Sequence, residues 1–297
     1  MTDSRNAAQS PQATRGNFLA PAYLWVAGLK GWRVFAFCAA LGAVANLAFP
    51  PFFIWPAFAI ALSGLVWVLD AARLAPKPKA AAFWRVFAFG FTYYLVGMHW
   101  IAWAFLVEPD AYLIFIWLPL VALPGGLALL LAGFMNAGFR FWNAGPARLI
   151  VFAVTFMFAE WFRSSLFGIG GLPWNLPGMI WSPGEAVSQS AAIWGIYGLS
   201  ALTVVAMAAP ATLADGRARG TTGSRAVPII VAAIVFGAIW GWGARRIGEI
   251  PDAPATGPMV RLVEAGVPQA EKHKPGVAEK IVLRFIALSG PDTANAP

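Results

Sequence analysis

The 297-residue sequence contains little cysteine, histidine or charge. Its single cysteine, Cys38, excludes a disulfide within the chain and any metal site built from several thiolates. The two histidines, His99 and His273, lie far apart in the sequence, which argues against a histidine metal site. Charged residues make up 11% of the chain, whereas a soluble domain has about 25%. We therefore expect no metal and no other cofactor, and we do not expect an ordinary soluble domain.

The chain is instead rich in apolar residues, and 59% of its residues are hydrophobic. Charged residues are absent from residues 34–69, 86–107, 111–139 and 186–214. Each of these stretches holds at least the ~20 apolar residues that a spanning helix needs. The sequence therefore predicts an all-α polytopic membrane protein with about seven transmembrane helices, near residues 33–49, 52–69, 84–107, 112–138, 148–166, 187–211 and 227–246.

Prolines divide and bend these predicted helices. Pro50-Pro51 separates the first two, because proline removes a backbone donor and disfavours helix in the residue before it. Pro56, Pro119 and Pro124 lie inside apolar runs and predict kinks.

Basic residues predict the orientation, because they are enriched in cytoplasmic loops. They collect in the N-terminal arm and in alternate loops, at Arg5, Arg15, Lys30, Arg33, Arg73, Lys77, Lys79, Arg85, Arg140, Arg148, Arg217, Arg219 and Arg225. The opposite loops carry Glu108, Asp110 and Glu185, with Arg163 as their only basic residue. We predict a cytoplasmic N-terminus and a periplasmic C-terminus. This topology accounts for the net charge of +8 without a nucleic-acid partner.

The first predicted helix has a second interpretation. Residues 34–45 resemble the core of a signal peptide, and Ala43-Val44-Ala45 resembles its cleavage site. Because the preceding arm is long and the apolar run continues past Pro51, we expect this helix to remain as an anchor. Cys38 lies inside it with no base or cation nearby in sequence, so we expect a buried apolar residue rather than a nucleophile.

Glu160 and Arg163 are the candidate functional pair. Ionisable groups at membrane depth cost about 2.5–3.5 kcal/mol each and are functional candidates by default. These two are three residues apart, on one helix face, and Gly170-Gly171-Leu172-Pro173-Trp174 follows. One interpretation is that Arg163 binds a lipid phosphate, Glu160 orients it and Trp174 shapes the loop. The other is an internal ion pair that only locks the helix end.

Two further candidates, His99 and Trp100, lie near the outer end of the third predicted helix. They contact a lipid head group in one interpretation. In the other they belong to an aromatic belt with Trp103 at the membrane surface. The sequence does not decide between these interpretations.

The sequence predicts three regions: a cytoplasmic arm (1–32), a transmembrane domain (33–247) and a periplasmic segment (248–297). In the last, 259–263 is typical of a strand and 278–288 of a short amphipathic helix with Ile281, Phe285 and Leu288 on one face. One strand and one helix cannot bury a core unaided. We expect the first βα unit of a larger soluble domain.

Several short sequence segments are informative because of the order in which they occur. They are Phe49-Pro50-Pro51 with Trp55-Pro56, Glu160-Trp161 with Arg163, Gly171-Leu172-Pro173-Trp174, Gln189 with 195–200, and 263–269. Together they resemble the bacterial apolipoprotein N-acyltransferase family. Glu264 and Gly266 depart from it, since Gln and Asn are expected there. The resemblance runs from about residue 33 to the C-terminus.

The resemblance implies a membrane domain joined to a nitrilase-like α/β/α domain in the bacterial inner membrane. It implies transfer of an acyl chain from a phospholipid to the N-terminal diacylglyceryl-cysteine of a lipoprotein. The family's catalytic Cys, Glu and Lys would follow Pro297, and Cys38 is in the wrong domain. We therefore expect a truncated chain that is inactive alone, with phospholipid, lipoprotein and membrane lipids as partners. A non-catalytic transporter or lipid-binding scaffold is the alternative.

Overall fold

The computed structural model describes residues 19–165, 171–215, 222–249 and 261–290, apart from 273 and 275, and no strand occurs within these ranges. The α-helices are α1 (Ala20–Gly28), α2 (Trp32–Ala45), α3 (Trp55–Ala72), α4 (Pro78–Met98), α5 (Pro109–Tyr112), α6 (Leu123–Gly138), α7 (Ala147–Ser164), α8 (Ala191–Ala208), α9 (Thr222–Glu249), α10 (Gln269–Lys272) and α11 (Ala278–Ser289). The chain divides into two units. The described residues within 1–99 and 117–249 form the first unit, and those within 100–116 and 250–297 form the second.

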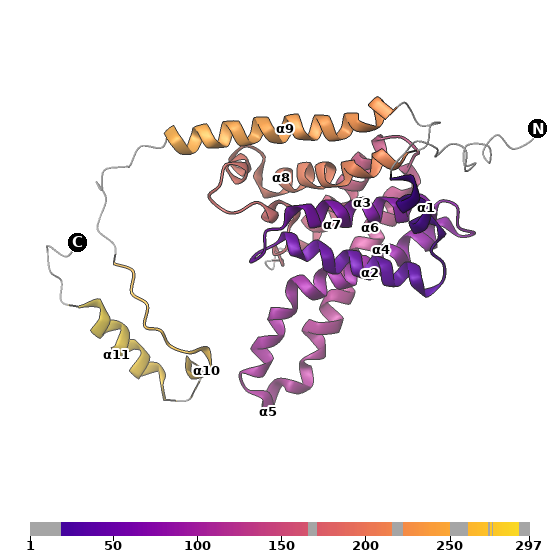
Figure 1. Ribbon diagram of the computed structural model, residues 1–297. Helices are drawn as coiled ribbons and strands as arrows, with labels where there is room; N and C mark the ends of the chain where they lie inside the picture. Colours follow the sequence, from indigo (N-terminus) through magenta and orange to yellow (C-terminus); the bar gives the residue numbers. More distant parts are fainter. Residues whose placement is uncertain are drawn as a thin grey trace, which may run out of the picture. The chain divides into compact units, whose positions relative to one another are not determined.

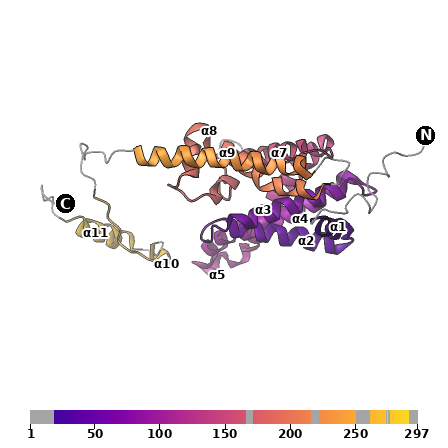
Figure 2. The ribbon, with the colours of Figure 1, turned by 45° about the horizontal axis from the view of Figure 1, so that its top comes forward.

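The first unit is a helical bundle in which six helices form a closed ring of contacts. In this ring α2 packs on α4, α4 on α6, α6 on α7, α7 on α8, α8 on α3, and α3 on α2. Helix α9 lies beside α8 and the turns that flank it (Figure 1, Figure 2). Many of its apolar side chains are exposed, among them Val227, Ile230, Val231, Ile234 and Trp240. Such an exposed apolar surface suits contact with lipid.

Small residues bring α2 and α4 close together. A Cβ added to Gly42 would collide with the carbonyl oxygen of Phe89 in α4. Nearby, the Thr92 hydroxyl donates a hydrogen bond of 2.7 Å to the carbonyl oxygen of Ala39. Small residues let helix backbones approach in membranes, and this packing replaces a hydrophobic driving force that lipid does not supply. The contact sets Tyr93 and Tyr94 of α4 in the core, both at most 1% exposed.

Long apolar helices confirm a multi-pass membrane protein. Within the described residues, four helical segments are long and apolar enough to cross a membrane: Trp55–Ala72, Pro109–Phe141, Val187–Ala214 and Ser224–Glu249. The apolar segment Trp32–Ala48 is shorter. Helix α7 carries the charged residues Arg148, Glu160 and Arg163. Each predicted span coincides with one of α2, α3, α4, α6, α7, α8 and α9 over most of its length.

The prolines act differently from the prediction at one position, Pro56. Pro124, two residues into α6, directly follows a π-helical segment within the helical stretch Pro109–Phe141, whereas Pro56 lies in the first turn of α3 and does not kink that helix. Proline is tolerated there because the first backbone N–H groups of a helix have no intrahelical acceptor. Pro119 lies in a π-helical segment, Leu118–Ala122, so an irregularity is present where one was predicted. The kink in α8 at Gly195, with φ of 67°, was not predicted.

Two helices differ from the prediction in extent. The predicted span 84–107 consists of α4, which ends at Met98, and a 3-10 helix over His99–Leu106. The predicted N-terminal arm contains α1, which packs against α3. The ring of Tyr23 in α1 lies edge-on to Trp67 in α3, with centroids 6.3 Å apart.

The second unit contains the short helix α5 and the C-terminal helices α10 and α11. Helix α11 confirms the predicted amphipathic helix, and Arg261 donates a hydrogen bond to the carbonyl oxygen of Ser289 at its end. The predicted strand over 259–263 is not observed in its described part. Residues 261–268 lie outside any helix or strand, and Met259 and Val260 lie outside the described residues. A strand needs a neighbouring strand to pair its backbone groups, and the described residues provide none.

Candidate functional site

The C-terminal end of α7 holds a buried ion pair. Glu160 is 0% exposed and Arg163 is 3% exposed. Arg163 Nε donates to Glu160 Oε2 at 3.0 Å, and Arg163 Nη2 donates to the same oxygen. The other carboxylate oxygen, Oε1, accepts a hydrogen bond of 2.6 Å from the Tyr94 hydroxyl on α4. Glu160 and Arg163 meet because they are three residues apart on α7. Tyr94 comes from α4, which packs against α2.

The remaining donors of Arg163 hold the loop that follows α7. Arg163 Nη1 donates to the carbonyl oxygen of Leu172, and Nη2 donates to that of Trp174 at 2.6 Å. Each of the three guanidinium nitrogens therefore has a partner in the protein. Gly171 fits against the backbone of Arg163 and Ser164, where a Cβ would collide. A side chain at this position would force the loop away from the guanidinium.

A second set of polar contacts fixes the far side of this loop. The Tyr93 hydroxyl donates to the carbonyl oxygen of Asn175 at 2.7 Å. Asn175 has a φ of 61°, in the left-handed region that Asn tolerates better than most residues. Asn46, just after α2, donates its amide to the carbonyl oxygens of Gly42 and Tyr93 at 2.9 and 3.0 Å. Residues 171–175, here called the Arg163 loop, are thus held by residues of α4 and α7, and α2 braces α4 beneath them.

The Arg163 loop leaves its tryptophan partly accessible. Trp174 is 45% exposed, although its own carbonyl oxygen is bound by Arg163. The adjacent residues Asn175 and Leu176 are 8% and 0% exposed. A rigid backbone with one accessible indole is an arrangement suited to contact with an apolar or interfacial group.

The structure brings together three of the five residues that the sequence singled out. Glu160, Arg163 and Trp174 meet at the Arg163 loop. His99 is exposed, and its Nδ1 lies 2.7 Å from the carbonyl oxygen of Val96. Trp100 is 44% exposed and belongs to the second unit.

Sequence analysis missed Tyr93, Tyr94 and Asn175, which complete the site. Tyr94 is 66 residues from Glu160 in sequence, and Tyr93 is 82 residues from Asn175. A polar residue in an apolar span was the only available signal. A polar residue in such a span is expected to form a buried hydrogen bond, but the sequence does not indicate with which residue.

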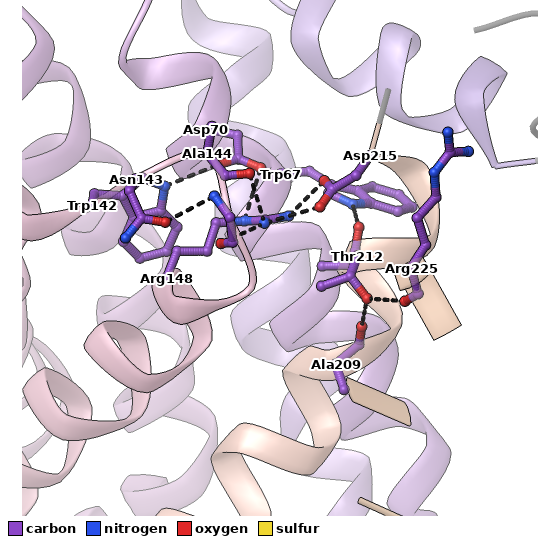
Figure 3. A network of polar contacts seen from close by, with 12 residues as sticks. Trp67, Asp70, Trp142, Asn143, Ala144, Arg148, Ala209, Thr212, Asp215 and Arg225 are labelled. Carbon is purple, nitrogen blue, oxygen red and sulfur yellow. Dashed lines mark hydrogen bonds and ion pairs between the residues drawn. The ribbon is translucent and has the colours of Figure 1, made fainter. Parts of the chain in front are cut away.

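The other end of α7 carries a buried cluster that the sequence also did not predict. Figure 3 shows Arg148 between two carboxylates from distant segments. Arg148 Nε lies 3.3 Å from Asp70 Oδ2, at the end of α3. Arg148 Nη1 and Nη2 donate to Asp215 at 3.1 and 2.7 Å, in a fork geometry. The Trp142 indole donates to Asp70 Oδ1 at 2.9 Å. Arg148 is 0% exposed.

Neither end of the bundle offers an arrangement for a metal ion. Among the described residues, no group of three or more His, Cys, Asp or Glu side chains is placed to hold one. Cys38 is 0% exposed within α2, as predicted for a packing residue.

Comparisons with known proteins agree with this arrangement of helices. A family profile described as apolipoprotein N-acyltransferase N-terminal domain matches residues 41–209. The chain is similar to the apolipoprotein N-acyltransferase of Allorhizobium ampelinum, at 35% identity over 91% of this chain and 50% of the relative. It is similar to the enzyme of the same name from Brucella suis, at 36% identity over 88% of this chain and 49% of the relative. The relative from Rhodopseudomonas palustris is 31% identical over 89% of this chain and 48% of its own length.

The chain spans about half the length of the curated relatives it matches. The family profile covers more than half of the chain, and it includes α3, α4, α6 and α7 with the Arg163 loop. The chain therefore belongs to the apolipoprotein N-acyltransferase family.

Proposed function

We propose that these residues form the membrane part of an enzyme that transfers an acyl chain from a phospholipid to the N-terminal diacylglyceryl-cysteine of a lipoprotein. The family assignment supports the acyl transfer, and the apolar helices support a lipid donor. The role of the membrane part is to hold a lipid in position for a catalytic domain.

The observation that carries this proposal is the Arg163 loop. Taking two charges out of water costs several kcal/mol per ion, so a buried pair needs compensating contacts. Here the compensation comes from the loop, since Arg163 donates to two of its carbonyl oxygens as well as to Glu160. In this proposal Arg163 and Glu160 are positioning residues, and Trp174 makes the contact with lipid.

This role differs from a direct contact between Arg163 and a lipid phosphate. The guanidinium already donates to one carboxylate and two carbonyl groups, and the residue is 3% exposed. A phosphate would have to displace at least one of these acceptors. His99 and Trp100 remain proposed lipid contacts on the basis of their exposed side chains.

The proposed topology has seven crossings in the inner membrane, with residues 1–32 in the cytoplasm and 248–297 in the periplasm. It is supported by the seven helices at the predicted positions and by the alternation of basic loops. Residues 248–297 would begin the nitrilase-like domain. Reporter fusions after Arg219 and after Arg246 test this topology, and a cytoplasmic signal from the second fusion would refute the odd number of crossings.

The reaction is tested with a chimera that joins residues 1–249 to the C-terminal half of the Allorhizobium ampelinum relative. It is produced in cells depleted of their own acyltransferase, and lipoproteins are analysed by mass spectrometry. The unmodified relative is the positive control. Triacylated lipoprotein from the chimera supports the proposal. A chimera that inserts at normal level but gives only diacylated lipoprotein would favour a non-catalytic transporter or scaffold.

The 297-residue polypeptide alone is the matched negative sample. We expect no transfer from it, because its one thiol is fully buried in α2. Covalent catalysis requires an accessible nucleophile, a base and an oxyanion donor within hydrogen-bond reach of one another. A triacylated lipopeptide, or a thioester on Cys38, would overturn this expectation.

A further inference from the structure

A groove between α2 and α4 has no role in the function proposed above. Its volume is about 460 Å³, and all but one of its lining residues are apolar. Ala36, Ala39 and Ala88 leave the space open because their side chains are small. The exception is Thr92, whose hydroxyl is already bonded to the carbonyl oxygen of Ala39. The groove therefore offers apolar surface and no spare hydrogen-bond donor of its own.

Aromatic side chains line the α4 side of this groove. Trp84, Phe87 and Phe91 follow one another at helical spacing. The ring centroids of Trp84 and Phe87 are 5.6 Å apart, and those of Phe87 and Phe91 are 6.2 Å apart. Rings in mutual contact have little freedom to fold into the groove and fill it. The groove therefore presents an apolar wall along which an acyl chain could lie.

A second hollow of about 640 Å³ lies at the N-terminal end of α2. It is lined by Lys30 and Arg33, which are both exposed, together with Trp25 and the turn around Gly31. Trp25 and Trp32 are 60% and 74% exposed. Exposed indoles favour the head-group level of a bilayer. The basic hollow is thus suited to an anionic head group.

We propose that one anionic glycerophospholipid occupies both hollows, with its phosphate at Lys30 and Arg33 and one acyl chain in the α2–α4 groove. Both hollows include residues of α2, and their nearest lining residues by rise, Arg33 and Ala36, are three residues, or about 4.5 Å, apart along the helix axis. Both volumes are in the usual range of about 300–1,000 Å³ for ligand pockets. Charge complementarity selects an anionic lipid over a zwitterionic one.

This lipid is distinct from the proposed acyl donor. The Arg163 loop is braced by Asn46, which lies thirteen residues from Arg33, or roughly 20 Å along α2. The basic hollow is therefore at the opposite end of α2 from the loop. The site is one for a structural lipid of the other leaflet, and it does not depend on the acyl-transfer proposal.

Native mass spectrometry of the purified 297-residue chain tests this inference. The chain in detergent is titrated with phosphatidylglycerol and, separately, with phosphatidylcholine of the same acyl chains. We expect one molecule of phosphatidylglycerol to be retained in preference to phosphatidylcholine. Lys30→Ala/Arg33→Ala should lower the affinity for phosphatidylglycerol about thirtyfold, from the usual contribution of two basic residues near anionic lipid, and lower that for zwitterionic phosphatidylcholine by less.

Two controls match the variants. Arg73→Ala/Arg140→Ala removes the same charge from exposed positions outside both hollows. Ala36→Trp fills the groove and should abolish retention of either lipid, whereas Ala40→Trp places the same indole on an exposed position of α2 outside it. Ala36→Leu replaces Ala36→Trp if the larger residue prevents folding. Equal retention of the two lipids, or equal loss in Ala36→Trp and Ala40→Trp, would overturn the inference.

Discussion

The two ends of α7 each bury an arginine, and the two arginines are used differently. Arg148 and Arg163 lie fifteen residues apart, or roughly 22 Å along the helix. Arg148 is shared by Asp70 and Asp215, which come from segments far away in the sequence. Arg163 pairs with Glu160 on its own helix and donates to two carbonyl oxygens of a loop.

We infer from this difference that the Arg148 cluster serves stability and that the Arg163 loop serves function. The Arg148 cluster joins α3, α7 and the segment after α8, and the side chains of Arg148, Asp70 and Asp215 are all buried. The Arg163 loop also connects distant segments, but it exposes Trp174. The comparison predicts that changes at Arg148 act on folding, and that changes at Arg163 act on transfer as well as on folding.

The largest expected effect is on stability, from Arg148→Ala. The substitution leaves two buried carboxylates without their cation, and breaking a buried pair costs about 3–5 kcal/mol. We expect a large fall in the thermal unfolding temperature of the purified chain in detergent. Arg73→Ala, which removes an exposed cation at the end of α3, is the control. Equal unfolding temperatures for the two variants would show that the cluster does not hold the bundle together.

The next effect is on transfer, from Arg163→Ala in the chimera. We expect a loss of about tenfold or more in transfer per inserted molecule, equivalent to about 1.4 kcal/mol. Membrane insertion should fall by less. Arg163→Lys should restore only part of the transfer, because an ammonium group cannot reproduce the fork of donors to Glu160, Leu172 and Trp174. Wild-type transfer by Arg163→Ala at matched protein levels would remove the loop from the proposed site.

Tyr94→Phe and Tyr93→Phe sharpen the comparison within the Arg163 site. The Tyr94 hydroxyl donates to a charged carboxylate, and such bonds contribute about 1.5–3 kcal/mol. The Tyr93 hydroxyl donates to a neutral carbonyl group, a bond of about 1 kcal/mol. Thermal unfolding should therefore rank Tyr94→Phe as the more destabilised variant. The opposite ranking would mean that the loop contact of Tyr93 matters more than the carboxylate.

The smallest expected effect on stability comes from Trp174→Ala. Its side chain is partly exposed, and substitutions at such surface positions usually change stability by within about 0.5 kcal/mol. We expect transfer by the chimera to fall severalfold without a change in unfolding temperature. Trp161→Ala removes an indole of similar exposure, 50%, from α7 itself and is the matched control. An equal effect of both variants on transfer would contradict a specific role for Trp174.

The sequence predicted the helices and the Glu160–Arg163 pair because both depend on local spacing. Long charge-free runs mark apolar helices, and an i, i+3 pair meets on any helix. Arg148 was interpreted only as a basic loop residue that sets the topology. Its true partners were hidden because Asp215 is 67 residues away, and only the folded bundle brings it to Arg148.

The irregular elements were predicted less well, for a related physical reason. The positive φ of Gly195 and of Asn175 depends on how the surrounding chain packs, which single-residue preferences do not specify. Pro56 was expected to kink a helix because the sequence does not show where the first turn begins. The strand expected near Val263 requires pairing partners that local pattern cannot supply.

We propose that Arg163 acts by holding the loop, beyond its pairing with Glu160. The most direct test is the double variant Glu160→Ala/Arg163→Ala in the chimera, measured for thermal unfolding and for transfer. Removing Glu160 as well eliminates the unpaired buried charge that Arg163→Ala leaves behind, so the unfolding temperature should recover part of the way toward that of the parent chimera. Transfer should stay as low as in Arg163→Ala, because the carbonyl groups of Leu172 and Trp174 still lack their donor. Recovery of transfer together with stability would contradict the account, since it would show that the unpaired charge of Glu160, rather than release of the loop, caused the loss.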